Sequence, residues 1–234
     1  MQFVRTTMSA ALCAVLASLL LVSETVAQTP PSAIESSAYQ GLHAAARDGD
    51  IVALQKLIAQ NANLEERDAK GRTPVHVAAF ASQDAALQVL SAAGADINAL
   101  ENRAYDVVTI AAVANDRALL DLALNLGASA RNVTSPYDGT ALIAAAHLGH
   151  HQVVKRLIAA GAPLDHVNNL GWTALIEAVI LGDGGANHVE IVRALIDAGA
   201  NSSIADRQGV KPLDYAKARG YTEIIHIIEL QGKL

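Results

Sequence analysis

The sequence predicts an all-α fold, a solenoid of about six stacked helix-turn-helix units with short hairpin-like turn tips. Two sequence segments recur in one register, and each pair of them brackets two short helical patterns of apolar residues. A unit of this size cannot bury its own apolar face, so neighbouring units must stack. The first segment is a short ending that recurs every 33 to 38 residues, at Gly94-Ala95, Gly127-Ala128, Gly161-Ala162 and Gly199-Ala200. The second occurs at Gly71-Arg72-Thr73-Pro74, Gly139-Thr140-Ala141, Gly171-Trp172-Thr173-Ala174 and Gly209-Val210-Lys211-Pro212.

The amino-terminal segment has the three parts of a secretory signal peptide. These are Arg5 near the start, an uncharged apolar run over residues 10–22, and the small residue Ala27 at the cleavage position. The run is shorter than the roughly 20 residues that span a bilayer as a helix. We therefore expect residues 1–27 to be removed on export, which leaves no membrane span, and residues 28–37, with Pro30 and Pro31, to form a flexible leader.

The fourth unit displays both helices of a unit. Residues 141–148 are small and apolar, Gly149-His150 interrupts the pattern, and apolar residues then recur at helical spacing over residues 153–158. The alanines of the first pattern let neighbouring helices approach closely, and the larger residues of the second fill the layer between units. Glycine in the recurring Gly-Ala ending suits a left-handed helix stop.

Three motifs in this register resemble the ankyrin repeat: Thr73-Pro74-Val75-His76, Gly149-His150-His151-Gln152-Val153-Val154 and the recurring Gly-Ala. The resemblance covers residues 38–232 and divides them into units at residues 38–66, 67–99, 100–132, 133–166, 167–204 and 205–232. The third unit departs most, with Asp106 in place of Thr and Ala104 in place of the tip Gly. The fifth unit carries about five extra residues, 183–187, which we expect in the turn between its two helices.

Composition excludes several classes of partner. The formal charge is −6, from 17 basic and 23 acidic residues, so there is no excess of basic residues to neutralise phosphates. Nucleic acid and anionic membrane surfaces are therefore not expected as partners. The single cysteine, Cys13, can form neither an internal disulfide nor a thiolate cluster for a metal.

The histidines are expected to be structural. His43 and His76 occupy one repeat position, where the resemblance implies local hydrogen bonding. His147, His150 and His151 approach metal-ligand spacing, but Gly149 interrupts them and no nearby carboxylate completes a set. The sequence also contains no GxSxG nucleophile elbow. We expect no metal, no cofactor and no catalytic residues.

The ankyrin resemblance implies that a partner contacts the turn tips and the exposed side of each first helix. Aromatic residues make up only 3% of the chain, yet four of them fall on these positions, which fits the composition of binding hot spots. The predicted partner-binding residues are Lys70, Arg72, Phe80, Arg103, Tyr105, Tyr137, Leu170, Trp172, Ile180 and Leu181.

These features predict a monomeric, non-catalytic scaffold of the periplasm or secreted space that binds another protein as an accessory or stabilising factor. An alternative is a periplasmic inhibitor or immunity protein that blocks a toxic enzyme. An enzyme is the outside alternative, because a solenoid offers a shallow groove rather than a deep cleft.

Overall fold

The computed structural model describes residues 28–231 and confirms the predicted all-α solenoid. The predicted signal peptide, residues 1–27, lies outside the described residues. Within residues 28–231 there are helices and loops but no strand, and one isolated β-bridge joins Thr134 and Gly139. No helix of this part of the chain is long and apolar enough to cross a membrane.

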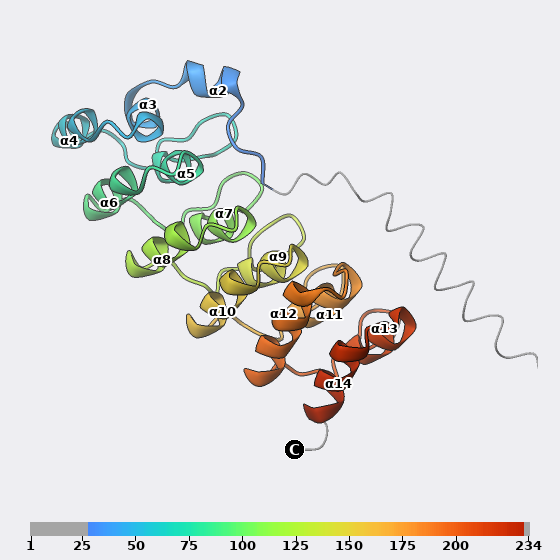
Figure 1. The fold of residues 1–234 in the computed structure, drawn as a ribbon. Helices are drawn as coiled ribbons and strands as arrows, with labels where there is room; N and C mark the ends of the chain where they lie inside the picture. Colours follow the sequence, from blue (N-terminus) through green and yellow to red (C-terminus); the bar gives the residue numbers. More distant parts are fainter. Residues whose placement is uncertain (1–27, 232–234) are drawn as a thin grey trace, which may run out of the picture.

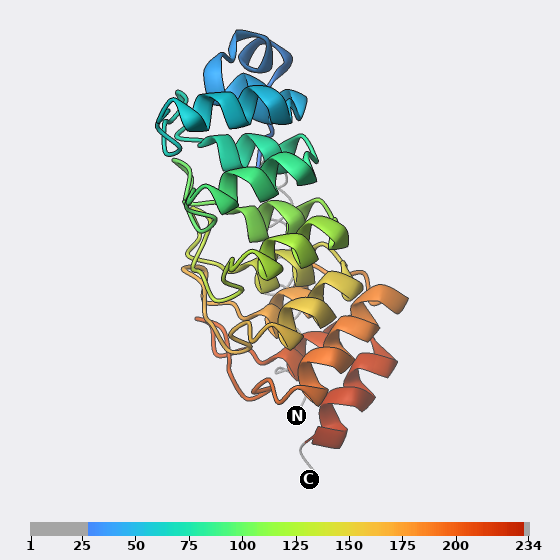
Figure 2. The same ribbon diagram turned by 90° about the vertical axis from the view of Figure 1, so that its left-hand side faces the viewer.

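Six helix pairs stack in two layers, and each pair falls within one of the six expected units (Figure 1). The inner layer holds α3 (Gly41–Asp48), α5 (Pro74–Phe80), α7 (Val107–Val113), α9 (Ala141–His147), α11 (Ala174–Ile180) and α13 (Pro212–Arg219). The outer layer holds α4 (Ile51–Ala59), α6 (Asp84–Ala92), α8 (Arg117–Asn125), α10 (His151–Ala159), α12 (Ala186–Asp197) and α14 (Thr222–Gln231). Figure 2 shows the long loops between pairs gathered along one edge of the stack.

Three inner helices, α7, α9 and α11, begin at capping side chains. Thr140 accepts a hydrogen bond from the backbone N–H of Ile143 at 3.3 Å, and Thr173 does the same for Ile176 at 3.2 Å. In the divergent third unit, Asp106 takes this role and accepts from the N–H of Thr109 at 2.8 Å. The third unit therefore keeps the geometry of the others with a different capping residue.

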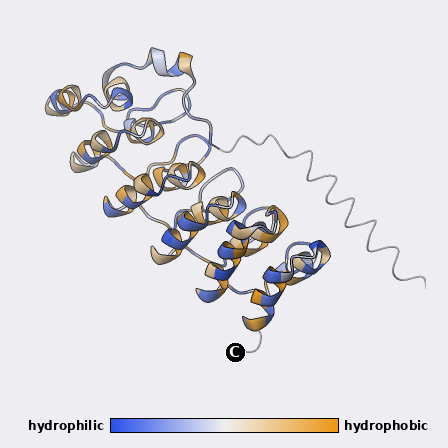
Figure 3. Cartoon of the chain, viewed as in Figure 1, coloured by the Kyte–Doolittle hydropathy of each residue, from blue (hydrophilic) through white to orange (hydrophobic). Residues whose placement is uncertain are grey.

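The core lies between the two layers and between successive pairs. The inner helices contribute alanines together with leucine, isoleucine and valine, and the outer helices contribute mainly leucine, isoleucine and valine. Figure 3 shows hydrophobic and hydrophilic residues on different sides of the outer helices, as expected for helices with one buried face. Leu157 of α10 is fully buried in this core.

The leader expected to be flexible is partly helical. Helix α2 (Ala33–Ala38) begins at Ser32, whose hydroxyl accepts from the N–H of Glu35 at 3.2 Å. The Glu35 carboxylate in turn accepts from the N–H of Ser32 at 2.8 Å, which completes a capping box. This reciprocal pair of bonds caps a short helix at the end of the segment that the sequence predicts to be a flexible leader.

The insertion of the fifth unit lies only partly in a turn. Residues 183–185 form the turn, whereas Ala186 and Asn187 are the first residues of α12. The carboxylate of Asp183 accepts hydrogen bonds from the N–H of Gly185 at 2.8 Å and shares one with His188 Nδ1 at 2.9 Å. The insertion therefore lengthens the outer helix as well as the turn.

Replacing Leu157 with alanine should lower the free energy of unfolding by about 2 to 5 kcal/mol, because it leaves a cavity between packed units. Urea denaturation followed by circular dichroism measures this. The control is Val52→Ala on α4, where the residue is 77% exposed and the change should stay within about 0.5 kcal/mol. Equal effects at the two positions would contradict the placement of the core.

Candidate partner-binding surface

The tips are the loops at residues 67–73, 100–106, 133–140, 167–173 and 205–211. Most of them are built by one side-chain oxygen that accepts two backbone N–H groups. Asp68 Oδ1 accepts from Lys70 at 2.8 Å and from Arg72 at 2.9 Å, and Asn168 Oδ1 accepts from Leu170 and Trp172, both at 3.0 Å. Equivalent pairs of bonds form at Glu101 and Asp206. These bonds hold the residues of each tip in a similar orientation.

Backbone hydrogen bonds also join neighbouring tips. The N–H of Asn102 donates to the Lys70 carbonyl at 3.0 Å, and that of Asn169 donates to the Tyr137 carbonyl at 2.8 Å. A third bond, 3.0 Å long, joins Ser135 to Ala104. These bonds link four successive tips into one continuous edge of the stack and fix the positions of the tips relative to one another.

The structure divides the ten predicted residues into three groups by exposure. Lys70, Arg103 and Leu170 are exposed, as a contact surface requires. Four are half-buried, namely Phe80, Tyr137, Trp172 and Leu181. Three are buried and cannot meet a partner in this conformation, namely Arg72, Tyr105 and Ile180.

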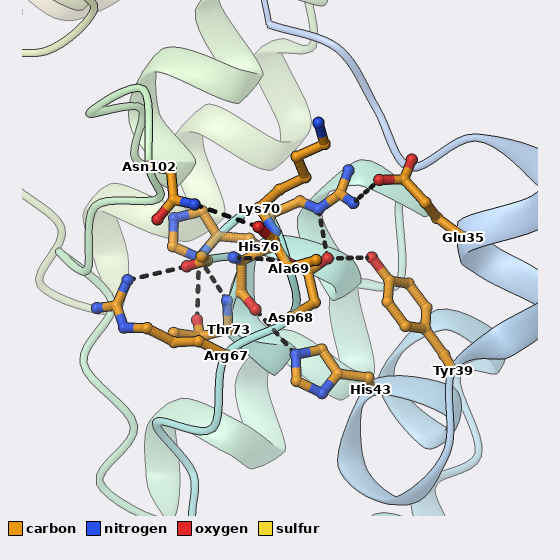
Figure 4. Close-up of polar contacts among 12 residues, drawn as sticks. Glu35, Tyr39, His43, Arg67, Asp68, Ala69, Lys70, Thr73, His76 and Asn102 are labelled. Carbon is orange, nitrogen blue, oxygen red and sulfur yellow. Dashed lines mark hydrogen bonds and ion pairs between the residues drawn. The ribbon is translucent and has the colours of Figure 1, made fainter.

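Arg72 is buried because α2 covers it. Its guanidinium contacts the carboxylate of Asp68 at 2.7 Å and that of Glu35 at 2.8 Å, and its side chain is only 4% exposed. The hydroxyl of Tyr39 donates a hydrogen bond to the same Asp68 carboxylate, and its oxygen lies 2.7 Å from Asp68 Oδ2 (Figure 4). We call these four residues the clamp. The amine of Lys70, in the same tip, points away from it (Figure 4).

The other two buried residues are covered by different parts of the chain. Tyr105 lines one groove together with residues 28–30, and its burial raises the pKa of its hydroxyl. The guanidinium of Arg103 lies 5.8 Å from the centre of the Tyr105 ring. Ile180 ends α11, which packs between α9 and α13, so only 4% of it is exposed. Trp172 also packs partly against the core, so its replacement would change stability as well as the surface.

A groove of about 410 Å³ lies beside the tips of the second and third units, residues 67–73 and 100–106. Five of the predicted residues line it, together with Gln28, Thr29, Pro30 and Glu35 from the amino-terminal segment and Glu101 and Asn102 from the third unit. The predicted five are Lys70, Arg72, Phe80, Arg103 and Tyr105. The sequence predicts these five residues on one surface, and in the structure they line one groove.

Sequence reasoning missed a row of exposed apolar residues. Leu100, Val133 and Val167 are the first residues of three successive tips and are 38%, 47% and 46% exposed. Their spacing of 33 and 34 residues is the repeat period, so alignment of the units by register gives a signal for them. Leu170, which is 40% exposed, lies in the same tip as Val167.

The histidines make the local hydrogen bonds expected of them. His43 Nε2 lies 2.8 Å from the carbonyl of Arg72, and His76 Nε2 lies 3.1 Å from the carbonyl of Tyr105, each in the next unit. Contrary to expectation, His147 does have a nearby carboxylate, because Glu177 of the next inner helix lies 3.5 Å away. Nowhere in residues 28–231 do three His, Cys, Asp or Glu side chains converge as a metal site would require.

Known proteins with similar sequences and structures share this architecture. Residues 8–101 and 108–187 match the family described as Ankyrin repeats (3 copies), and residues 170–207 match the single Ankyrin repeat. The chain is 35% identical over 102 residues, 43% of its length, to the ankyrin repeat protein YahD of Escherichia coli (strain K12) and spans 51% of that relative. An ankyrin repeat domain solved from Acinetobacter baumannii AYE is 42% identical, with a TM-score of 0.77 over 82% of this chain and 97% of that domain. A second solved ankyrin repeat protein is 32% identical, with a TM-score of 0.74 over 82% of this chain and 98% of its own.

The clamp should make stability depend on pH. Hydrogen bonds from the backbone and side chain of Ser32 hold the pKa of Glu35 below its ordinary value, and Arg72 acts in the same direction. Burial alone would raise the pKa of Asp68, but hydrogen bonds from Tyr39 and Arg72 outweigh it and lower that pKa. Carboxyl groups with a lowered folded-state pKa stabilise the fold above their unfolded values, about 4, and lose this contribution as pH falls through the folded values.

The melting temperature of Asp68→Asn should therefore lie well below that of the unmodified chain at pH 7, and the gap should shrink toward pH 3. Thermal denaturation at a series of pH values measures it. Asp84→Asn, at an exposed position on α6 away from the clamp, is the control and should show no such converging gap. A gap for Asp68→Asn that stays constant with pH would contradict the role assigned to the clamp carboxylates.

Proposed function

Since the chain belongs to the ankyrin-repeat family, we propose that it is a non-catalytic scaffold that binds another protein through its tips and the adjoining side of the inner helices. The observation that carries this proposal is the row of exposed apolar residues on hydrogen-bonded tips. Leu100, Val133, Val167 and Leu170 expose apolar surface that the fold itself does not use. Contact with a partner would remove this surface from water.

The rigidity of the tips favours binding. Association costs free energy when loops and side chains must become ordered, and tips already joined by hydrogen bonds avoid part of that cost. Successive helix layers are about 9 Å apart, so the row spans roughly 18 Å, within one standard interface of about 800 Å² per partner. The half-buried Tyr137 and Trp172 lie in the same tips as Val133 and Val167 and add aromatic surface.

The proposed location is the periplasm or the secreted space, where the chain would act as an accessory or stabilising factor for its partner. The basis is the sequence of residues 1–27, with Arg5, the apolar run and Ala27 at the cleavage position. Removal of that segment would also remove Cys13, which leaves no thiol in the mature chain. This suits an oxidising compartment.

Replacing two exposed tip residues at once tests the proposed surface. Val167→Asp with Leu170→Asp should weaken binding of the partner by at least about 25-fold, because the charges must be desolvated at the centre of the contact. The chain is used to capture its partner from an extract of the proposed compartment, and titration calorimetry then measures the affinity.

Val52→Asp on the outer helix α4 is the matched control, since Val52 is exposed on an element away from the tips. It should leave the affinity unchanged, and circular dichroism should show both variants folded. Equal affinity of the tip variant and the control would rule out the tips as the binding surface. An extract from which the chain retains no protein would contradict the scaffold proposal itself.

Export is tested separately by sequencing the amino terminus of the protein recovered from cells. We expect a chain that begins at Gln28, because Ala27 provides the small residue before the cleavage point. Recovery of the intact chain from the cytoplasm, with no shortened form elsewhere, would overturn the proposed location.

A further inference from the structure

The groove beside the tips of the second and third units is partly filled by the chain's own amino-terminal segment. Residues 28–32 run from α2 along the loops that precede α5 and α7 (Figure 1). Gln28 is 8% exposed, and Gln28, Thr29 and Pro30 all line the groove. We call residues 28–38, which comprise this segment and α2, the strap.

Two groups of contacts anchor the strap at its two ends. At the α2 end, Glu35 forms the 2.8 Å ion pair with the buried Arg72, and Arg47 donates a hydrogen bond to the Ser36 carbonyl. At the other end, Gln28 is buried and lines the groove together with Tyr105. Two residues that the sequence pattern places on the partner-binding surface are therefore occupied by the strap.

The fit between the strap and the groove is incomplete. The side-chain Nε2 of Gln28 is buried without a hydrogen-bond partner, and a buried donor left unpaired costs free energy. About 410 Å³ of space also remains beside residues 28–30. A ligand that satisfies the same anchors and fills this space would make contacts that the strap does not make.

We propose that the strap is an internal ligand that occupies part of the partner-binding surface, so that a partner reaching the tips of the second and third units must displace it. The groove accepts an extended chain segment with two features. Its backbone runs along the part of the groove that Tyr105 lines, and a carboxylate meets Arg72. The competition with a partner rests on the proposed function, whereas occupation of the groove by the strap does not.

Binding of the strap as a separate peptide tests its role as a ligand. A fluorescent peptide of residues 28–38 is titrated into a chain that lacks those residues and into the chain that retains them. Saturable binding is expected only to the shortened chain, because in the other the groove is already filled. Binding to neither chain, or equal binding to both, would overturn the inference.

Two variant peptides provide the specificity control. Glu35→Gln should weaken peptide binding by about tenfold or more, because it removes a charged hydrogen bond to a buried guanidinium. Ile34→Ala should change it by less than about twofold, since Ile34 is 82% exposed and does not line the groove. Equal weakening by the two substitutions would overturn the assignment of Glu35 as an anchor.

A second measurement uses the complete chain, in case the shortened chain does not fold. Hydrogen exchange of backbone amides in residues 33–38 should become at least about tenfold faster in Glu35→Gln than in Ile34→Ala, because release of the strap exposes them. Equal exchange rates in the two variants would show that Glu35 does not hold the strap and would overturn the inference.

Partner affinity tests the competition itself. If the strap fills the groove nine-tenths of the time, removing residues 28–38 should tighten binding about tenfold. Unchanged affinity would overturn the competition, even where the peptide binds. A failure of the proposed function gives a different result. In that case no partner is captured for the tip-variant experiment, while the peptide of residues 28–38 still binds the shortened chain.

Discussion

The close contact between neighbouring inner helices is the constraint on which the rest of the structure depends. One alanine at the same position of every inner helix makes that contact possible, because a larger side chain would push the helices apart or force strained rotamers. The six alanines are at most 5% exposed: Ala45, Ala78, Ala111, Ala145, Ala178 and Ala216. Since each tip leads directly into an inner helix, the spacing of the helices also sets the spacing of the tips.

The hydrogen bonds between tips translate that spacing into a continuous surface. The bonds from Asn102 to Lys70 and from Asn169 to Tyr137 are 3.0 and 2.8 Å long, so a small displacement of one unit would break them. The divergent third unit keeps its place in this edge. Asp106 replaces Thr as the helix cap, and Ala104 adopts the left-handed φ of 59° that Gly71, with φ 77°, adopts in the second unit. Function at the tips therefore depends on alanines that no partner would touch.

The sequence predicted the fold well, because its repeat period, caps and left-handed stops are local properties of each unit. It also predicted the exposure of Lys70, Arg103 and Leu170, which the tip geometry alone determines. It failed for Arg72 and Tyr105 for a different physical reason. Their positions within a unit are those of surface residues, but Glu35 and residues 28–30 cover them. The position of a residue within a repeat predicts its place in the unit. It does not predict which segment outside the repeats covers its side chain.

In the described part of the chain the first unit has no tip of its own, and this explains why such a segment lies there. The tips of the third to sixth units each have a preceding tip to pack against, whereas the tip of the second unit, residues 67–73, has none and would leave Asp68 and Arg72 at the open end of the stack. Helix α2 supplies Glu35 to Arg72, and Tyr39 supplies its hydroxyl to Asp68. One short segment thus satisfies charges at the end of the solenoid and occupies part of the candidate binding surface. A partner that displaced the strap would need to provide its own carboxylate to Arg72, since a buried guanidinium left with fewer partners is costly. Asp68 would keep its bonds to Tyr39 and Arg72, which lie outside the strap, whereas Arg72 would lose Glu35. The need to cap the stack therefore selects acidic segments over neutral ones at this groove.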